Sequence, residues 1–84
     1  MTVINRWYQI LEILVAQHQV SFSELRYELS VSSHTLQKSI DQLNDVLDGD
    51  IKIRQQDNQL TLEVYDYARL EDIMAGSLRK ESDF

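Results

Sequence analysis

The chain has 84 residues, of which 43% are hydrophobic and 26% charged, the composition of one small folded domain and not of a disordered segment. It contains no cysteine, which excludes disulfides, thiolate metal sites and cysteine nucleophiles and is compatible with a reducing cytoplasm, where we expect it. Its longest apolar run, from Ile13 to Ala16, is far too short to span a membrane. A domain this small leaves little room for an enclosed substrate cavity, so we expect no enzyme activity.

The net charge is −6, whereas domains that bind nucleic acids are usually basic. The location of the charges matters more than their sum. Residues 1–40 are neutral and the range 51–64 is balanced, so the acidic excess lies in 41–50 and 65–84. A neutral DNA-facing surface with acidic residues elsewhere is therefore compatible with this sequence.

The segment from Ile4 to Gln17 has the periodicity of an amphipathic helix. Apolar residues recur on one side of it, and we interpret this stripe as part of the core. The stripe consists of Ile4, Trp7, Leu11, Leu14 and Val15, with Tyr8 beside it.

A second, shorter helix is predicted from Phe22 to Leu29. Ser21 and Glu24 have the spacing of a capping box, in which the serine hydroxyl accepts a hydrogen bond from the amide of Glu24 and the carboxylate reaches back. Val20 before the cap and Leu25 after it form a hydrophobic staple.

The same pattern returns almost at once and predicts a third helix. Ser32 is the expected N-cap, with Val31 and Leu36 as the staple. The gap after the second helix is so short that the two helices must cross at a steep angle, as in a helix-turn-helix. One face of the third helix carries Leu36, Ile40, Leu43 and Leu47.

Gly49 is expected to end the third helix, and a β-hairpin follows. Its first strand alternates apolar and basic residues, and its second alternates apolar residues with Thr61 and Glu63. The connection from Gln55 to Gln59 has no Asn-Gly pair, so the turn type stays open. The apolar positions are Ile51, Ile53, Leu60, Leu62 and Val64.

Asp66 is the expected N-cap of a fourth helix, with Tyr67, Leu70, Met74 and Leu78 on one side. The element order predicts a mainly α fold with a small β-hairpin: a winged helix-turn-helix with a three-helix core, a two-stranded wing and an extra C-terminal helix. We expect residues 1–65 to form this domain. Residues 66–84 are expected to be a C-terminal helix and tail that link it to further domains outside this chain.

The stretch from Phe22 to Asn44 resembles the N-terminal winged helix-turn-helix domain of two bacterial regulator groups. These are the PRD-containing, BglG-like activators controlled by the sugar phosphotransferase system, and the related Mga-type virulence regulators. The resemblance covers about residues 4–65. The positions that match the family pattern are Leu25, Leu29, Val31, Ser32, Thr35, Leu36, Ile40, Leu43 and Asn44.

This resemblance implies a DNA-binding domain of a transcription regulator, with double-stranded DNA as its partner and no cofactor. It also implies a homo-oligomer in the full-length protein, and phosphotransferase-system proteins as partners of domains outside this chain. The sequence departs from the family at Arg26, where a small alanine is usual, and at His34 and Lys38, where relatives often carry arginine.

We expect the third helix, about residues 33–47, to be the recognition helix, whose N-terminal part enters the major groove, and the wing, about residues 51–64, to lie on the DNA backbone. In this sequence Gln37 can read adenine and Lys38 can read guanine. Ser33 and His34 can contact base edges or phosphates. Ser32 and Thr35 lie at the helix start, where backbone amides favour a phosphate.

Lys52 and Arg54 share one face of the first wing strand and are the natural contacts to phosphates or the minor groove. Solvated charges on an exposed strand are the alternative interpretation. A winged helix that binds protein without binding DNA is the alternative function, and the negative charge favours it. No metal site is expected, because Asp48-Gly49-Asp50 lacks the other ligands of a calcium loop and His18 is distant from His34.

Overall fold

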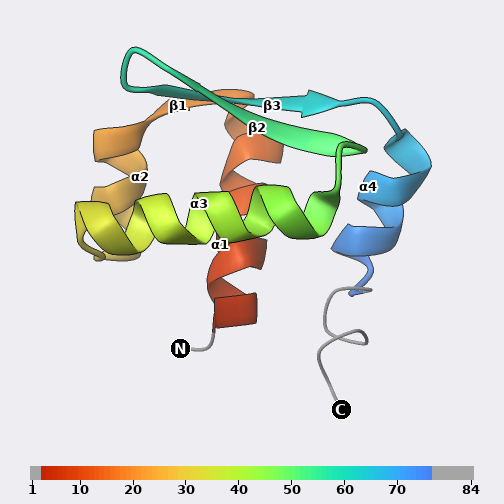
Figure 1. Ribbon diagram of the computed structural model, residues 1–84, viewed down its shortest axis with the longest axis horizontal. Helices are drawn as coiled ribbons and strands as arrows, with labels where there is room; N and C mark the ends of the chain where they lie inside the picture. The colour runs from red at the N-terminus through yellow and green to blue at the C-terminus, as the bar shows by residue number, and fades with distance from the viewer. Residues whose placement is uncertain (1–2, 77–84) are drawn as a thin grey trace.

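In the computed structural model, which describes residues 3–76, a small antiparallel sheet lies across a group of helices (Figure 1). β3 is the central strand, with β1 and β2 on either side. The element order is α1 (Val3–Gln17), β1 (Gln19–Ser21), α2 (Phe22–Leu29), α3 (Ser33–Leu47), β2 (Ile51–Gln56), β3 (Gln59–Val64) and α4 (Tyr67–Met74).

The buried face of α1 confirms most of the predicted stripe. Val15 is an exception, because 38% of it is exposed, and the buried position that the prediction lacked is Ile10. The reason is rotation about the helix: Ile10 lies one turn before Leu14 and on the same side, whereas Val15 is turned away by one position. The side chain of Ile4 lies outside the described part of the chain. The buried residues of α1 are Trp7, Tyr8, Ile10, Leu11 and Leu14.

Both predicted serine caps are present. The Oγ of Ser21 accepts a hydrogen bond from the amide of Glu24 at 3.0 Å, and the Oγ of Ser32 accepts one from the amide of Thr35 at 3.1 Å. Between the two helices, Ser30 adopts a left-handed conformation with φ of 54°. This reversal lets α3 start after a short connection, and the helix-turn-helix is confirmed.

The end of α3 differs in detail from the prediction. The helix ends at Leu47, and the reversal begins at Asp48 with φ of 51°, one residue before Gly49 with φ of 88°. Glycine adopts this left-handed conformation at little cost, and aspartate is one of the few other residues that tolerate it. The two residues together turn the chain into β2.

The β-hairpin is confirmed, but its turn is shorter than predicted. β2 and β3 pair out to Gln56 and Gln59, so that only Asp57 and Asn58 form the turn. Both have positive φ, 49° and 66°, as a type I′ turn requires. The polar glutamines that flank this turn indicate a loop in the sequence, yet in the structure they continue the ladder.

The strand β1 was not predicted. Its three residues pair with β3 in antiparallel register, with Val20 opposite Leu60. The wing hairpin is therefore part of a three-stranded sheet. So short a strand between a helix and a cap shows no alternation that a sequence pattern can reveal.

The cap of α4 is confirmed, because the Oδ1 of Asp66 accepts from the amide of Arg69 at 3.1 Å. The predicted buried face is only partly confirmed: Leu70 is partly buried and packs against the core, but Tyr67 and Met74 do not. Ile73 is fully buried, whereas 70% of Tyr67 and 37% of Met74 are exposed. The helix is rotated by about one position, so that Ile73 and not Met74 faces the core. Leu78 lies outside the described residues.

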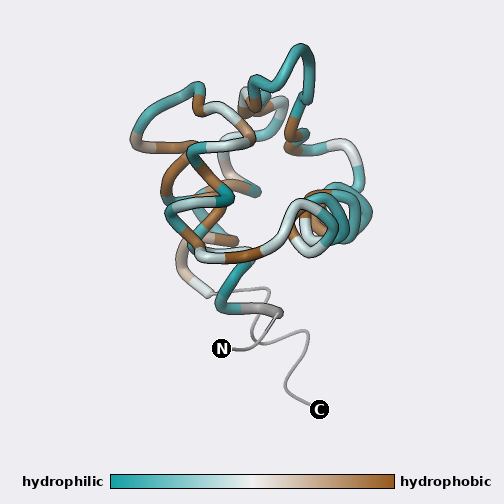
Figure 2. Tube along the Cα trace, turned by 90° about the vertical axis from the view of Figure 1, so that its left-hand side faces the viewer, coloured by the Kyte–Doolittle hydropathy of each residue, from teal (hydrophilic) through white to brown (hydrophobic). Residues whose placement is uncertain are grey.

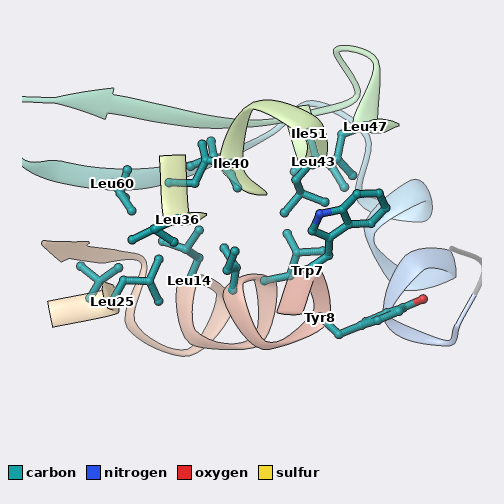
Figure 3. Packing of buried hydrophobic residues seen from close by; sticks show 14 of the residues in the cluster. Trp7, Tyr8, Leu14, Leu25, Leu36, Ile40, Leu43, Leu47, Ile51 and Leu60 are labelled. Atoms are coloured by element: carbon teal, nitrogen blue, oxygen red, sulfur yellow. The ribbon is translucent and has the colours of Figure 1, made fainter. Parts of the chain in front are cut away.

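A single core joins the sheet to the helices (Figure 3). Leu14 of α1, Leu25 of α2, Leu36 of α3 and Leu60 of β3 contribute to it, and each is fully buried. Trp7 and Tyr8 lie at the side nearer α4. Three helices, a two-stranded wing and an additional C-terminal helix constitute a winged helix-turn-helix fold, as predicted. Among residues 3–76, no helix combines the length and hydropathy needed to cross a membrane.

Candidate nucleic-acid interface

The helix α3 separates an apolar inner face from a polar outer face. Figure 2 shows α3 nearly end-on, with its hydrophilic positions on the outer side. His34 and Lys38 are exposed in its N-terminal half, whereas Asp41 and Asp45 are exposed further along. The outer face is therefore basic at its beginning and acidic towards its end, so an anion meets favourable charge only at the N-terminal half.

The hydroxyl groups at the start of α3 are engaged with one another. Besides accepting from the amide of Thr35, the Oγ of Ser32 donates to the Oγ1 of Thr35 at 2.9 Å. Ser33 is exposed beside them. Within the described residues, Ser33, His34 and Lys38 show no hydrogen bond from their side chains, so these three are free to contact a ligand.

The side chain of Gln37 faces the wing. Its Nε2 donates to the Oε1 of Gln55 at 3.0 Å, and the Nε2 of Gln55 donates to the Oε1 of Gln37 at 2.9 Å. The Nε2 of Gln37 also donates to the Oδ1 of Asp41 at 3.1 Å. The structure thus separates Gln37 from the other predicted α3 residues and brings it to Gln55, a residue that the prediction assigns to the hairpin connection and not to the site.

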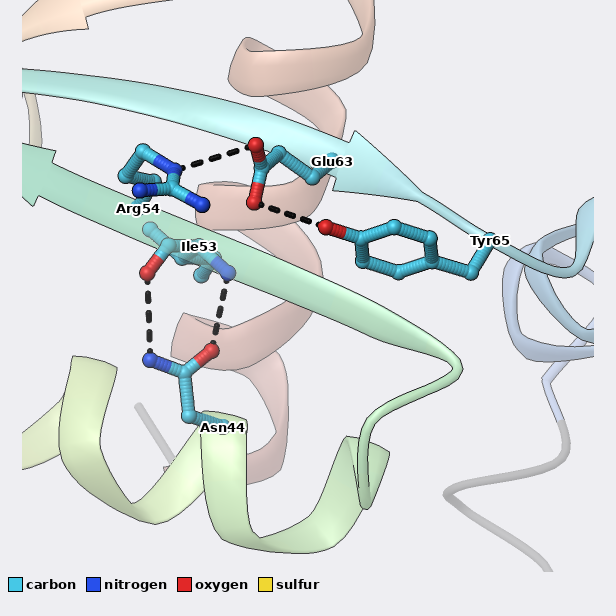
Figure 4. Close-up of polar contacts among 5 residues, drawn as sticks. All are labelled: Asn44, Ile53, Arg54, Glu63 and Tyr65. Atoms are coloured by element: carbon cyan, nitrogen blue, oxygen red, sulfur yellow. Dashed lines mark hydrogen bonds and ion pairs between the residues drawn. The ribbon is translucent and has the colours of Figure 1, made fainter.

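A second contact joins α3 to the edge of β2 (Figure 4). The Oδ1 of Asn44 accepts from the amide of Ile53 at 2.9 Å, and its Nδ2 donates to the carbonyl of Ile53 at 3.2 Å. Asn44 is one of the positions that carry the family resemblance. Its contact with β2 gives that position a structural role at the junction of the helix and the wing.

The two basic residues of the wing lie on the outer face of the sheet. Ile51 and Ile53 are buried, and alternation along β2 directs Lys52 and Arg54 to the opposite, exposed side. The structure therefore places these two residues together, but on a different face from His34 and Lys38. β2 is the strand of the wing that contacts α3.

Arg54 is paired with an acid. Its Nε lies 3.0 Å from the Oε2 of Glu63, and the hydroxyl of Tyr65 donates to the Oε1 of the same carboxylate at 3.1 Å (Figure 4). The hydrogen bond and charge of Glu63 raise the pKa of Arg54. The hydrogen bond from Arg54 lowers the pKa of Glu63, burial partly opposes this, and the Tyr65 hydroxyl lowers it further. Within residues 3–76, Lys38 and Lys52 show no such ion pair.

Two of the residues that the prediction did not assign to the site, Gln55 and Glu63, belong to the wing. Gln55 continues the odd-numbered row of Ile51 and Ile53, so the alternation already placed it on the side of the helices. Glu63 becomes a partner of Arg54 only once the register is known: Lys52 lies opposite Glu63, and Arg54 is two residues further on. No group of three or more potential metal ligands occurs among the residues that the structure describes.

A helix-turn-helix with a polar outer helix face and an adjoining wing is the architecture of a DNA-binding domain. The family model of the Mga helix-turn-helix domain matches residues 5–62, and the chain belongs to this family. The predicted resemblance to Mga-type regulators is thereby confirmed. Neither a curated protein nor a solved structure matches the chain. Family membership makes DNA binding in transcription regulation, and not catalysis, the general role of this domain.

Proposed function

We propose that this domain binds double-stranded DNA sequence-specifically as part of a bacterial transcription regulator, with the N-terminal half of α3 in the major groove. The observation that carries the proposal is the outer face of that half, where Ser33, His34 and Lys38 are exposed without internal partners. An amino group at Lys38 suits the guanine O6 and N7 acceptors. The start of the helix, with Ser32 and Thr35, suits a phosphate.

The wing supplies contacts that do not depend on sequence. Lys52 is exposed and suits a backbone phosphate, which improves affinity for every sequence alike. Arg54 suits the same role but must first leave Glu63, its present partner. The acidic half of α3 is expected to stay clear of the DNA, since its carboxylates would repel phosphates.

So small a basic surface implies weak binding by one copy. Non-specific binding should have a dissociation constant of about 10⁻⁴ M or weaker at physiological salt. Useful specificity then requires several modules held together, because tethering raises the effective concentration. We therefore propose a cytoplasmic homo-oligomer in which residues 1–65 bind DNA and residues 66–84 lead to further domains, the ones on which phosphotransferase-system proteins would act.

The test is a selection of preferred duplexes from a random library, followed by fluorescence-anisotropy titrations at several salt concentrations. We expect binding that weakens with salt and favours the selected duplex over a random one. Sub-micromolar binding by the monomer would contradict the multivalent arrangement. A protein that binds neither duplex at low salt would overturn DNA binding and favour a protein-contact role, consistent with the net charge of −6.

A further inference from the structure

Three side chains connect the proposed recognition helix to the wing: Gln37 and Asp41 on α3, and Gln55 on β2. Their hydrogen bonds measure 2.9 to 3.1 Å and form a continuous unit, here called the amide clip. The clip stands next to the buried row of β2. Gln55 follows Ile51 and Ile53 on the same face of the strand but lies beyond the core, where it is exposed.

The chemistry of the clip conflicts with base readout by Gln37. A glutamine reads adenine with the edge of its amide that carries one N–H and the carbonyl oxygen side by side. In the reciprocal pair, each glutamine donates to and accepts from the other, so this edge is occupied in both. The Nε2 of Gln37 also donates to Asp41. Gln37 must therefore break these bonds before it can contact a base in that way.

The geometry gives the clip a different use. Asn44 holds the backbone of Ile53, and Gln37 holds Gln55, two residues further along β2. Gln37 and Asn44 are separated by about two helical turns, so they lie on the same side of α3. Up to Ile53, β2 is fixed by its buried side chains and by Asn44. Beyond Ile53 the strand is exposed, and Gln37 holds this part of it to α3.

Resting on the proposed DNA-binding function, we propose that Gln37 is a positioning residue and not a base reader. Through Gln55 it holds the part of the wing beyond Ile53 against α3, so that the tip of the wing and the recognition helix are presented to one duplex in a fixed relation. Gln55 is then as important for binding as Gln37, although neither touches a base. Loss of either weakens binding to all sequences without changing the preferred one.

The clip can be tested first in the free protein, by ¹⁵N NMR of the side-chain amides. Gln37→Ala is expected to move the side-chain NH₂ signals of Gln55, and Gln55→Ala those of Gln37. Gln42→Ala is the matched control, because it removes another glutamine from α3 that has no hydrogen bond within the described residues. Signals that do not respond to the loss of the other glutamine would overturn the contact itself, whatever the protein binds.

DNA binding is tested with the same two variants and their double. Each single variant should weaken binding by about two- to tenfold, because the wing then occupies its binding orientation only part of the time. The double variant should lose no more than either single one, because both changes remove one contact. Thermal unfolding should change little, since exposed hydrogen bonds between side chains add little stability.

Three results would overturn the positioning role. Additive losses in the double variant would mean that the two glutamines act separately. A changed base preference in Gln37→Ala, with Gln55→Ala unaffected, would make Gln37 a direct reader. A parent protein that binds no duplex would overturn both this role and the proposed function, and the NMR response of the free protein would then still show whether the clip exists.

Discussion

Asn44 occupies the free edge of β2 as a neighbouring strand would, by pairing with both backbone groups of Ile53 at 2.9 and 3.2 Å. β2 has β3 on one side only, so the backbone groups on its other side need a partner. A helix side chain supplies that partner, and the position of the wing therefore depends on a residue of α3.

Replacing Asn44 by alanine is expected to destabilise the fold by about 1–3 kcal/mol, because the partly buried amide and carbonyl of Ile53 lose their partner. Urea unfolding measures the change. Gln42→Ala, at an exposed position of the same helix, should stay within about 0.5 kcal/mol of the parent. An Asn44→Ala variant as stable as this control would show that water replaces the contact at no cost.

Removal of either serine cap, by Ser21→Ala or Ser32→Ala, should lower the free energy of unfolding by about 0.5–2 kcal/mol. Each hydroxyl accepts from a helix amide that would otherwise lack a partner. Thermal melts compare both variants with Ser33→Ala, which leaves the cap of α3 in place. Parent-like melting of both cap variants would contradict this assignment.

Glu63 should remain ionised at a lower pH than an ordinary glutamate, because the hydrogen bond from Arg54, aided by the Tyr65 hydroxyl, lowers its pKa. An unfolded glutamate ionises near pH 4.3. The stability that this pair adds is therefore complete above that pH and is lost as the pH falls through the lower pKa of the folded state.

A ¹³C NMR titration of the Glu63 carboxyl measures this pKa directly. In the Tyr65→Phe variant the pKa of Glu63 should rise but stay below that of an ordinary glutamate, since Arg54 remains in place. An unchanged titration in that variant would show that the Tyr65 hydroxyl does not lower the pKa of Glu63.

Glu63→Gln should strengthen DNA binding, because it releases Arg54 for a phosphate. The slope of log affinity against log salt is about −0.9 per neutralised phosphate, so we expect the slope of the variant to be steeper than that of the parent by about 1. Glu71→Gln removes an equal charge from α4, at the far end of α3 (Figure 1), and should leave the slope unchanged. Equal slopes in all three proteins would show that Arg54 does not reach the DNA.

Lys38 and Lys52, the lysines of residues 3–76, should differ in what they contribute to binding. Lys38→Ala is expected to relax the preference at one base pair, by about 1–3 kcal/mol of discrimination. Lys52→Ala should weaken selected and random duplexes by the same factor, since a phosphate contact carries no sequence information. Binding-site selection with each variant separates the two effects, and an unchanged preference in Lys38→Ala would place that residue outside the groove.

Most of the fold follows from local signals in the sequence. The caps at Ser21, Ser32 and Asp66 and the leucine row of α3 were predictable, because they depend on neighbours within one or two turns. The rotation of α4 and the pairing of β1 were not, because both are set by packing against distant segments. The periodicity of a sequence predicts whether a segment is a helix or a strand, but not which distant segment packs against it.

The same division applies to the candidate site. The exposure of His34 and Lys38 followed from the opposite, buried face of α3. The partners of Gln37 and Arg54 did not follow from the sequence. Gln55 belongs to β2 and not to the predicted connection, and Glu63 meets Arg54 through the register of the hairpin. Those partners change the expected behaviour of two predicted residues, one now tied to the wing and the other to a carboxylate.

The edges of the sheet present few free backbone groups with which a strand of another chain could pair. Exposed strand edges are templates on which protein chains aggregate or exchange segments, and natural proteins usually block them. Here one edge, β1, has only three residues, and the other is occupied at its middle by the Asn44 carboxamide. Copies that lie side by side along DNA are therefore not expected to pair their sheets edge to edge. Loss of Asn44 would free the edge of β2 and so promote aggregation as well as unfolding.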